Sequence, residues 1–388
     1  MEKAKREQSM NSCDPWEPFR DVMQDPWAYA RIWKERTGGK VIGHLLPDVP
    51  EEIIHAAGGL PMAVQGAGGR ITHAQAHIPD YTCSHAMGAM ELGLRGEMKI
   101  LDAMIIPYVC DTTRNLFHIW NHCFPEFAND FFRLPKRLGE PRARKYLQSE
   151  LCRLVHFVAS VTGNPVGPER LWQSIALYNK SRARLRNAYR LGIENPKVWT
   201  AERVQLLIGS AMRSCREEHL RWMDALPWDL ESSPLVGDSI PLYVRGKVWD
   251  PPEITVILQD LGFTVVRDEI VSGYRSIEVD VSPESNDPIA GLVERHERTI
   301  PYTAYHMNPL DITTQFVRRV RESGARAVLF LNPKFCDAAW FDTPDLSAAL
   351  DEEGIPKLVL ETSARGESTQ QIRLRLEAFR EVLVGDLM

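Results

Sequence analysis

The sequence predicts an α/β fold: two Rossmann-like parallel-sheet domains, with a helical segment between them and a helical N-terminal arm. Two patterns support this. Short apolar runs alternate with helix-like segments in residues 40–142 and again in residues 236–388, which is typical of parallel sheets. Residues 143–235 between them are helical in pattern and end in a Pro- and Ser-containing stretch that marks a boundary. Residues 1–39 form the arm.

The first predicted domain begins with an apolar strand at residues 40–46, followed by a helix that starts at Pro50 and stops at Gly58. A proline at the first helical position and acidic side chains in the first turn suit a helix N-terminus. Residues 60–64 predict the next strand. Residues 81–94 predict a helix with Cys83 near its start.

An apolar strand at residues 103–109 then ends at Cys110, and the run Asp111-Thr112-Thr113 is expected to cap the following helix. Residues 131–135 predict one more strand.

In the arm and the helical segment, apolar residues recur at helical spacing. These residues are Trp27, Ala30 and Trp33, then Leu147, Leu151, Leu154, Val155 and Val158, then Leu171, Ile175 and Tyr178.

The second predicted domain repeats the alternation. Strands are expected at residues 241–244, 263–268, 327–331 and 357–360, and helices at residues 252–261 and 312–322. The strand at 327–331 leads to Cys336. A closing helix is expected after the capping pair Ser368 and Gln371, with Ile372, Leu376, Phe379 and Leu383 on its apolar face.

Composition and charge narrow the function. The 388 residues carry a net charge of −6, which gives no bulk attraction to nucleic acid or anionic lipid. No run of 18 apolar residues exists, so no membrane span is expected. The charged N-terminus has no apolar segment behind it, which argues against a signal peptide and predicts a cytoplasmic location.

Standard nucleotide-binding motifs are not found. The run Gly66-Ala67-Gly68-Gly69 lacks the later glycine of the dinucleotide fingerprint, and Gly39-Lys40 is not part of a phosphate-binding loop. We therefore expect this chain to bind neither NAD nor ATP.

The cysteines carry the strongest chemical signal. The seven cysteines are Cys13, Cys83, Cys110, Cys123, Cys152, Cys215 and Cys336. Their odd number and wide scatter do not suit a disulfide framework. The sequence contains no Cys-x-x-Cys pair, so the spacing does not indicate a zinc site. Cys110 and Cys336 follow predicted strands, at the sheet edge where open α/β folds build their sites, and Cys83 begins a helix that favours a thiolate. Three thiolates from two domains suit an iron–sulfur cluster better than magnesium or calcium.

Packing remains the alternative interpretation, because cysteine is often simply buried. For Cys13, Cys152 and Cys215 packing is the preferred interpretation. It is also preferred for Cys123, although Cys123 lies only a few helical turns beyond Cys110.

Several blocks of the sequence resemble the benzoyl-CoA reductase and 2-hydroxyacyl-CoA dehydratase family. They span residues 40–383. They are Val49-Pro50-Glu51-Glu52-Ile53-Ile54-His55-Ala56-Ala57-Gly58 with Leu60-Pro61, Tyr81-Thr82-Cys83-Ser84 with Glu91-Leu92-Gly93-Leu94, Pro107-Tyr108-Val109-Cys110-Asp111-Thr112-Thr113-Arg114-Asn115, Asn332-Pro333-Lys334-Phe335-Cys336-Asp337, and the ending Gly354-Ile355-Pro356, Leu360-Glu361 and Arg375-Leu376-Glu377-Ala378-Phe379.

The resemblance implies one 4Fe-4S cluster held by three cysteines, here Cys83, Cys110 and Cys336, with one iron left without a cysteine. It also implies an acyl-CoA substrate. The implied partners are a homologous larger cluster-bearing subunit, ATP-hydrolysing activator subunits with their own cluster, and a low-potential donor such as ferredoxin. No nucleic acid or membrane partner is expected.

Other polar residues are weaker candidates, and no catalytic residue is assigned. Glu51 and Glu52 could act as acid or base but also suit the helix dipole. A histidine near the cluster could donate protons, and the candidates are His44, His73, His77 and His85. Arg114 and Asn115 could donate hydrogen bonds to cluster sulfurs or could lie on a helix surface.

Within the family the resemblance is strongest to the smaller cluster-bearing subunit of ATP-dependent benzoyl-CoA reductase. The expected reaction is dearomatisation of benzoyl-CoA, or a related aryl-CoA, to a cyclic dienoyl-CoA. Three alternatives remain open: a 2-hydroxyacyl-CoA dehydratase subunit, a non-catalytic electron-relay subunit, and a metal-free α/β binding protein.

Overall fold

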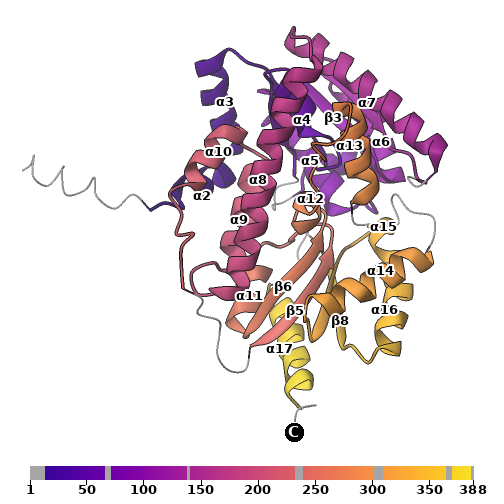
Figure 1. Cartoon of the computed structure of the whole chain (residues 1–388). Coiled ribbons are helices and arrows are strands. Elements are labelled where there is room, and N and C mark those ends of the chain that lie inside the picture. The colour runs from indigo at the N-terminus through magenta and orange to yellow at the C-terminus, as the bar shows by residue number, and fades with distance from the viewer. Residues whose placement is uncertain are drawn as a thin grey trace, which may run out of the picture.

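Two four-stranded parallel sheets form the centre of the protein, and helices cover them (Figure 1). The computed structural model describes residues 14–65, 71–137, 140–231, 239–299, 309–363 and 369–385. The prediction of an α/β fold with two Rossmann-like sheets is confirmed. Within these ranges, no helix has both the length and the apolar character needed to cross a bilayer.

The first sheet has the strand order β2-β1-β3-β4. Its strands are β1 (Val41–His44), β2 (Leu60–Ala63), β3 (Ala103–Tyr108) and β4 (Ala128–Arg133). The connecting helices are α4 (Glu51–Ala56), the short η1 (Ala74–Ala76), α5 (Ser84–Leu94) and α6 (Asp111–Cys123). The inner strands β1 and β3 are almost entirely buried, as expected of a sheet covered on both faces.

The second sheet repeats this arrangement with the order β6-β5-β7-β8. Its strands are β5 (Ile240–Gly246), β6 (Phe263–Ile270), β7 (Ala327–Pro333) and β8 (Lys357–Thr362). In both sheets the chain places its first strand between the second and the third. The two lobes therefore share one topology.

Seven helices follow β5 along the described part of the chain. They are α11 (Ile254–Asp260), α12 (Tyr274–Ile277), α13 (Pro288–Arg298), α14 (Pro309–Glu322), α15 (Asp337–Trp340), α16 (Thr343–Glu352) and α17 (Thr369–Gly385). The predicted apolar face of the closing helix is buried in α17, whereas Ser368 lies outside the described residues.

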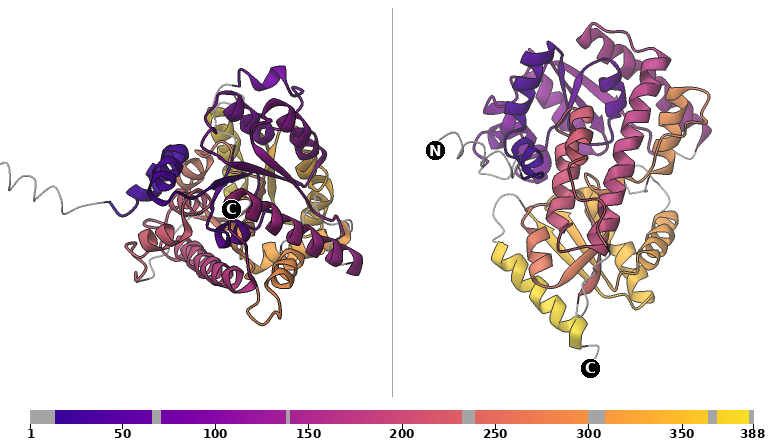
Figure 2. Two further views of the ribbon diagram at one scale, coloured as in Figure 1. Left: turned by 90° about the horizontal axis from the view of Figure 1, so that it is seen from above. Right: turned by 60° about the vertical axis from the view of Figure 1, so that its left-hand side comes forward.

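Further helices precede the first sheet and connect it to the second, and α7 and α8 are the longest of them. Before β1 come α2 (Glu17–Gln24) and α3 (Pro26–Thr37), and between the sheets come α7 (Pro141–Thr162), α8 (Pro168–Glu194), α9 (Ala201–Ala211) and α10 (Arg216–Met223). Helix α8 contacts α4 of the first lobe and β6 of the second, and Figure 2 shows it running along both. Helix α8 therefore packs against both lobes and links them.

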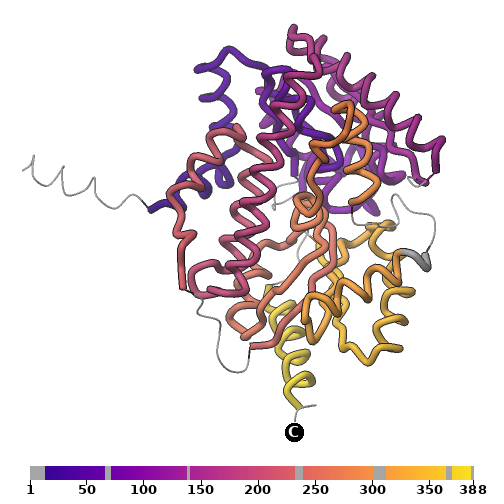
Figure 3. Tube along the Cα trace, viewed as in Figure 1, coloured from indigo at the N-terminus to yellow at the C-terminus, as the bar shows by residue number. Residues whose placement is uncertain are grey.

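Helix α13 returns from the second lobe to the first. It packs against α7 and α8, and the tube in Figure 3 shows it beside the first lobe. Its Leu292 and Val293 are buried in the same apolar cluster as Ile105 of β3. The chain thus crosses between the lobes more than once, which fixes their relative position.

The structure departs from the sequence-based expectations in two places. The N-cap of α6 is Cys110 and not one of the three residues after it, although the Thr113 hydroxyl completes the cap by accepting the Cys110 N–H. Helices α12, α13, α15 and α16 are present although the sequence patterns do not predict them.

Candidate functional site

The carboxyl ends of the central strands bring Cys110 and Cys336 to equivalent places in the two lobes. In each sheet the strand order reverses between the first and third strands, which is where open α/β sheets bind ligands. Cys110 follows β3 and Cys336 follows β7. Each lies three residues after a proline, Pro107 in one sheet and Pro333 in the other.

The strand register supports this equivalence. Ile105, two residues before Pro107, pairs with His44, and Leu331, two residues before Pro333, pairs with Gly246. The cysteines therefore follow matched positions of two copies of one strand plan.

All three candidate cysteines cap the helix that follows them. Cys83 is the N-cap of α5, Cys110 of α6 and Cys336 of α15. The backbone N–H groups of His85 and Ala86 lower the pKa of Cys83, and that of Ala339 lowers the pKa of Cys336. Such N–H donors favour the thiolate, which is the form that binds iron.

The three thiols lie within electrostatic range of one another. Burial, together with the negative charges of Cys336 and Cys110, raises the pKa of Cys83 to about 12. Burial also raises the pKa of Cys336, which nearby Lys247 lowers and Cys110 raises. The fold thus gathers thiols from residues 83, 110 and 336, and none of the three is fully buried by solvent accessibility.

The described residues offer no three-ligand site for a single metal ion. Among the described residues, no three His, Cys, Asp or Glu side chains converge closely enough to hold one ion. A cluster does not require such convergence, because each cysteine binds a different iron of the inorganic core. Three thiols that influence one another without meeting at a point are consistent with that geometry.

Two lysines stand beside these cysteines, and the sequence patterns single out neither. The Lys136 ammonium donates to the carbonyl of Val109, the residue before Cys110, over 2.7 Å and lies 4.8 Å from the Tyr108 ring centroid. Lys247 directly follows β5, the neighbour of β7. A lysine just beyond a strand, at the edge where a site is expected, is the signal that could have identified Lys247.

A contact between the lobes adjoins Cys83. The Ser84 hydroxyl donates to the Asp250 carboxylate over 3.1 Å, linking the start of α5 to the loop after β5. Nearby, Asp48 and Arg275 form a buried pair at 3.3 Å between the same two lobes. These contacts hold the lobe that carries Cys83 and Cys110 against the lobe that carries Cys336.

The residue before Cys336 has an unusual backbone. Phe335 has φ of 62°, in the left-handed region that a bulky residue rarely adopts. Such strain concentrates at functional sites, where the surrounding structure maintains it. The strained turn sets the direction in which Cys336 leaves β7.

The four candidate histidines have different surroundings. His44 is fully buried, with Nδ1 at 3.0 Å from the Leu46 carbonyl and Nε2 at 3.1 Å from Glu51. His85 Nε2 lies 3.0 Å from the Leu45 carbonyl, and burial lowers its pKa. His73 and His77 are exposed, and His77 Nδ1 lies 3.4 Å from the Cys123 thiol.

Glu51 and Glu52 belong to buried ion pairs. Burial would raise the pKa of Glu51, but Arg216, at 2.5 Å, and His44 outweigh it and lower the pKa to about 2. Glu52 pairs with Arg182 at 2.7 Å, which lowers its pKa despite burial. Both carboxylates are therefore ionised at neutral pH and stabilise the fold, so they are poor proton donors.

The remaining candidates do not belong to the set formed by Cys83, Cys110 and Cys336. Arg114 and Asn115 are exposed on α6, and Arg114 pairs with Asp111 at 3.5 Å. Cys152 is exposed, and the Cys215 thiol donates to Glu217 at 3.1 Å. Cys13 lies outside the described residues.

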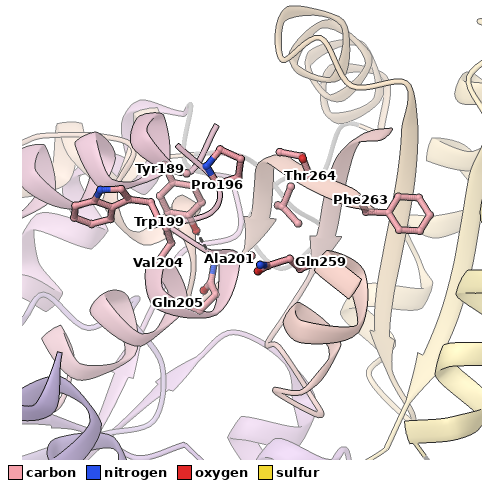
Figure 4. A pocket seen from close by; sticks show the side chains of 11 residues that line it. Tyr189, Pro196, Trp199, Ala201, Val204, Gln205, Gln259, Phe263 and Thr264 are labelled. Carbon is pink, nitrogen blue, oxygen red and sulfur yellow. Dashed lines mark hydrogen bonds between the residues drawn. The ribbon is translucent and has the colours of Figure 1, made fainter. Parts of the chain in front are cut away.

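A separate pocket lies between α8, α9 and β6. Tyr189, Trp199, Gln205 and Phe263 are among its lining residues, and none of the three candidate cysteines is (Figure 4). The Tyr189 hydroxyl donates to the buried Asp268 carboxylate, which Gln205 also contacts. The Gln205 amide also donates to the Tyr189 hydroxyl, and these bonds link α8 and α9 to β6.

Comparison with known proteins gives the family model and the relatives that the chain matches. The family described as 2-hydroxyglutaryl-CoA dehydratase, D-component matches residues 48–383. The chain is 27% identical to the lactoyl-CoA dehydratase subunit beta of Anaerotignum propionicum, over 94% of this chain and 97% of that protein. It is 28% identical to a benzoyl-CoA reductase subunit of Thauera aromatica, over 91% and 93% of the two chains. It is 24% identical to the (R)-2-hydroxyglutaryl-CoA dehydratase subunit beta of Acidaminococcus fermentans, over 95% and 98%.

Proposed function

Because the chain belongs to the 2-hydroxyglutaryl-CoA dehydratase D-component family, we propose that it is the iron–sulfur subunit of a low-potential acyl-CoA enzyme. Its relatives are subunits of acyl-CoA dehydratases and of benzoyl-CoA reductase. The observation that carries the proposal is the gathering of Cys83, Cys110 and Cys336 from two lobes within electrostatic range.

These three thiolates would hold one 4Fe-4S cluster and leave one iron without a protein sulfur. When bound, the cluster supplies one-electron chemistry and an iron position open to a small ligand. Residues of the chain would orient it: the backbone N–H groups at the starts of α5 and α15 would stabilise the thiolates, and the Ser84–Asp250 contact links the two lobes beside Cys83.

The proposed reaction is reduction of benzoyl-CoA, or a related aryl-CoA, to a cyclic dienoyl-CoA. Two electrons and two protons add to the ring and remove its aromaticity. The 28% identity to the benzoyl-CoA reductase subunit of Thauera aromatica supports this choice, together with the sequence block around Cys110. The electrons would come from ATP-hydrolysing activator subunits with their own cluster, supplied by a donor such as ferredoxin.

A 2-hydroxyacyl-CoA dehydratase is the second candidate. The comparable 27% identity to a lactoyl-CoA dehydratase subunit favours it, and it would use the same cluster. In an electron-relay version of either complex, a homologous larger subunit alone would bind the substrate.

Exposed aromatic side chains beside the cysteines support assembly with other subunits. Tyr81 and Phe341 are 72% and 71% exposed and lie within five residues of Cys83 and Cys336 in the sequence, and Phe335 is 40% exposed. Large exposed rings are frequent anchors of protein interfaces.

Turnover by the reconstituted complex separates the candidates. The chain is combined anaerobically with its partner subunits, activator and reductant, and given benzoyl-CoA or a 2-hydroxyacyl-CoA. Formation of a dienoyl-CoA supports the reductase, and formation of an enoyl-CoA supports the dehydratase. If neither forms although the chain holds its cluster, the proposed reactions are wrong.

A further inference from the structure

Two positive charges flank the proposed cluster ligands, one from each lobe. Lys136 lies just beyond β4 of the first sheet, and Lys247 lies just beyond β5 of the second. We infer that Lys136 and Lys247 are positioning residues that balance the negative charge of the thiolate-ligated cluster and thereby set its reduction potential. This inference rests on the proposed cluster and assigns roles to residues that the proposed function leaves unused.

The geometry around Lys136 fixes its charge beside Cys110. Its ammonium donates to the Val109 carbonyl at 2.7 Å and stands over the Tyr108 ring, so two contacts within residues 108–109 anchor it. An ammonium held between a carbonyl and an aromatic face keeps a defined position. Burial lowers the pKa of Lys136, and a charge on Cys110 counters this effect.

Lys247 follows β5, the inner neighbour of β7, whereas Lys136 follows β4, the edge neighbour of β3. The register pairs Gly246 with Leu331, so Lys247 leaves β5 where β7 continues toward Cys336. Burial lowers the pKa of Lys247 to about 8, and the largest opposing effect is the charge of Cys336. Burying an ammonium is costly unless negative charge is near; Asp342 supplies part of that charge, and a cluster with its thiolates would add to it.

The consequence follows from electrostatics. Reduction adds one negative charge to the cluster, and a nearby positive charge stabilises the reduced form more than the oxidised form. The two lysines therefore raise the reduction potential of the cluster, so that its electron donor can reduce it more easily. Because both lysines are partly buried, solvent and salt screen their charges less than they screen a fully exposed charge.

The test is an EPR-monitored redox titration of the reconstituted chain and of Lys136→Gln and Lys247→Gln. Each variant is expected to shift the ratio of oxidised to reduced cluster about tenfold at fixed potential, a lowering of about 59 mV for one electron. Lys247→Arg keeps the charge and is expected to restore most of the potential. Lys145→Gln, which removes an exposed charge from α7, is expected to change the ratio less than about twofold, since an exposed charge is screened.

A second measurement guards against damage to the fold. Circular dichroism and the rate of iron release to a chelator are compared for each glutamine variant and Lys247→Arg. A well-folded variant with the wild-type potential would overturn the inference, and so would an equal shift in Lys145→Gln or a failure of Lys247→Arg to restore the potential. If the wild-type chain assembles no cluster, the proposed function itself fails.

Discussion

Cys110 and Cys336 occupy matched positions in two copies of one topology. Each lies three residues after a proline at the end of the third strand of its sheet, and each is the N-cap of the next helix. Cys83 joins them from the start of α5. The charges of these three thiols act on one another, and this is the basis for the shared site that we propose.

Serine substitution at each of the three cysteines tests this arrangement. Cys83→Ser, Cys110→Ser and Cys336→Ser are each expected to lose most of the iron bound after anaerobic reconstitution, because a hydroxyl is a poor iron ligand. Cys152→Ser is the control, since Cys152 is exposed, and it is expected to keep its iron. Full iron content in any of the first three variants would contradict the ligand assignment.

A variant of Cys123 tests whether this cysteine is also a ligand of the cluster. Its thiol lies against His77 at 3.4 Å, and burial raises its pKa. Cys123→Ser is expected to retain iron and the EPR spectrum of the wild type. Loss of the cluster in this variant would place a fourth cysteine in the site.

Gly246 is expected to be intolerant of a side chain. A Cβ there would lie 2.6 Å from the Leu331 carbonyl oxygen and 2.9 Å from Ile270, so β5 would have to move away from β7. Gly246→Ala should lower the free energy of unfolding by about 1–3 kcal/mol, as overpacking commonly does. Urea unfolding of the apo chain measures this.

Gly167 provides the matched control, because a Cβ added there would meet no atom within 4 Å and the residue caps the exposed start of α8. Gly167→Ala should change stability by less than about 1 kcal/mol, the usual range for a cap position. Equal losses in the two variants would contradict the packing argument.

The buried pair of Glu51 and Arg216 is expected to be essential for stability. Glu51→Gln leaves the Arg216 guanidinium buried without its carboxylate, which typically costs about 3–5 kcal/mol. Glu169→Gln, at an exposed first-turn position of α8, is the control and should cost less than about 1 kcal/mol. Urea unfolding at pH 7 compares them, and a near-neutral Glu51→Gln would refute the assignment.

The same pair predicts the direction of acid sensitivity. The pKa of Glu51 is about 2 in the folded chain against 4.5 normally, so its contribution is fully present above about pH 4.5. The contribution is lost as the pH falls from 4.5 toward 2, because the unfolded chain then binds the proton more readily. Unfolding measured across this window should show a steeper loss for the wild type than for Glu51→Gln. Parallel curves would show that Glu51 is not the responsible group.

The sequence predicts the sheets well because their central strands are short, continuous apolar runs. The runs around Ile105 and Leu329 are buried on both faces, so composition alone reveals them. Helices α12 and α15 are only four residues long and carry no periodic signal. Helix α13 buries Arg295 and His296 beside Leu292, a pattern that does not read as an apolar face.

The gathering of the cysteines depends on how the lobes pack, which no local pattern encodes. Strand ends place Cys110 and Cys336 each at a sheet edge, but their common site depends on long-range contacts such as Asp48–Arg275. Buried arginines such as Arg182 are equally unpredictable, because arginine is normally exposed. The place of Lys247 just after β5 could have marked it as a candidate, but the nearness of Lys136 and Lys247 to the thiols depends on this packing.

We propose above all that the thiols of Cys83, Cys110 and Cys336 bind one iron–sulfur cluster. The most direct test is iron and acid-labile sulfide analysis of the chain after anaerobic purification and reconstitution, with EPR of the reduced protein. We predict about four irons and four sulfides per chain and the signal of one 4Fe-4S cluster. A chain that binds neither iron nor sulfide under these conditions would contradict the account.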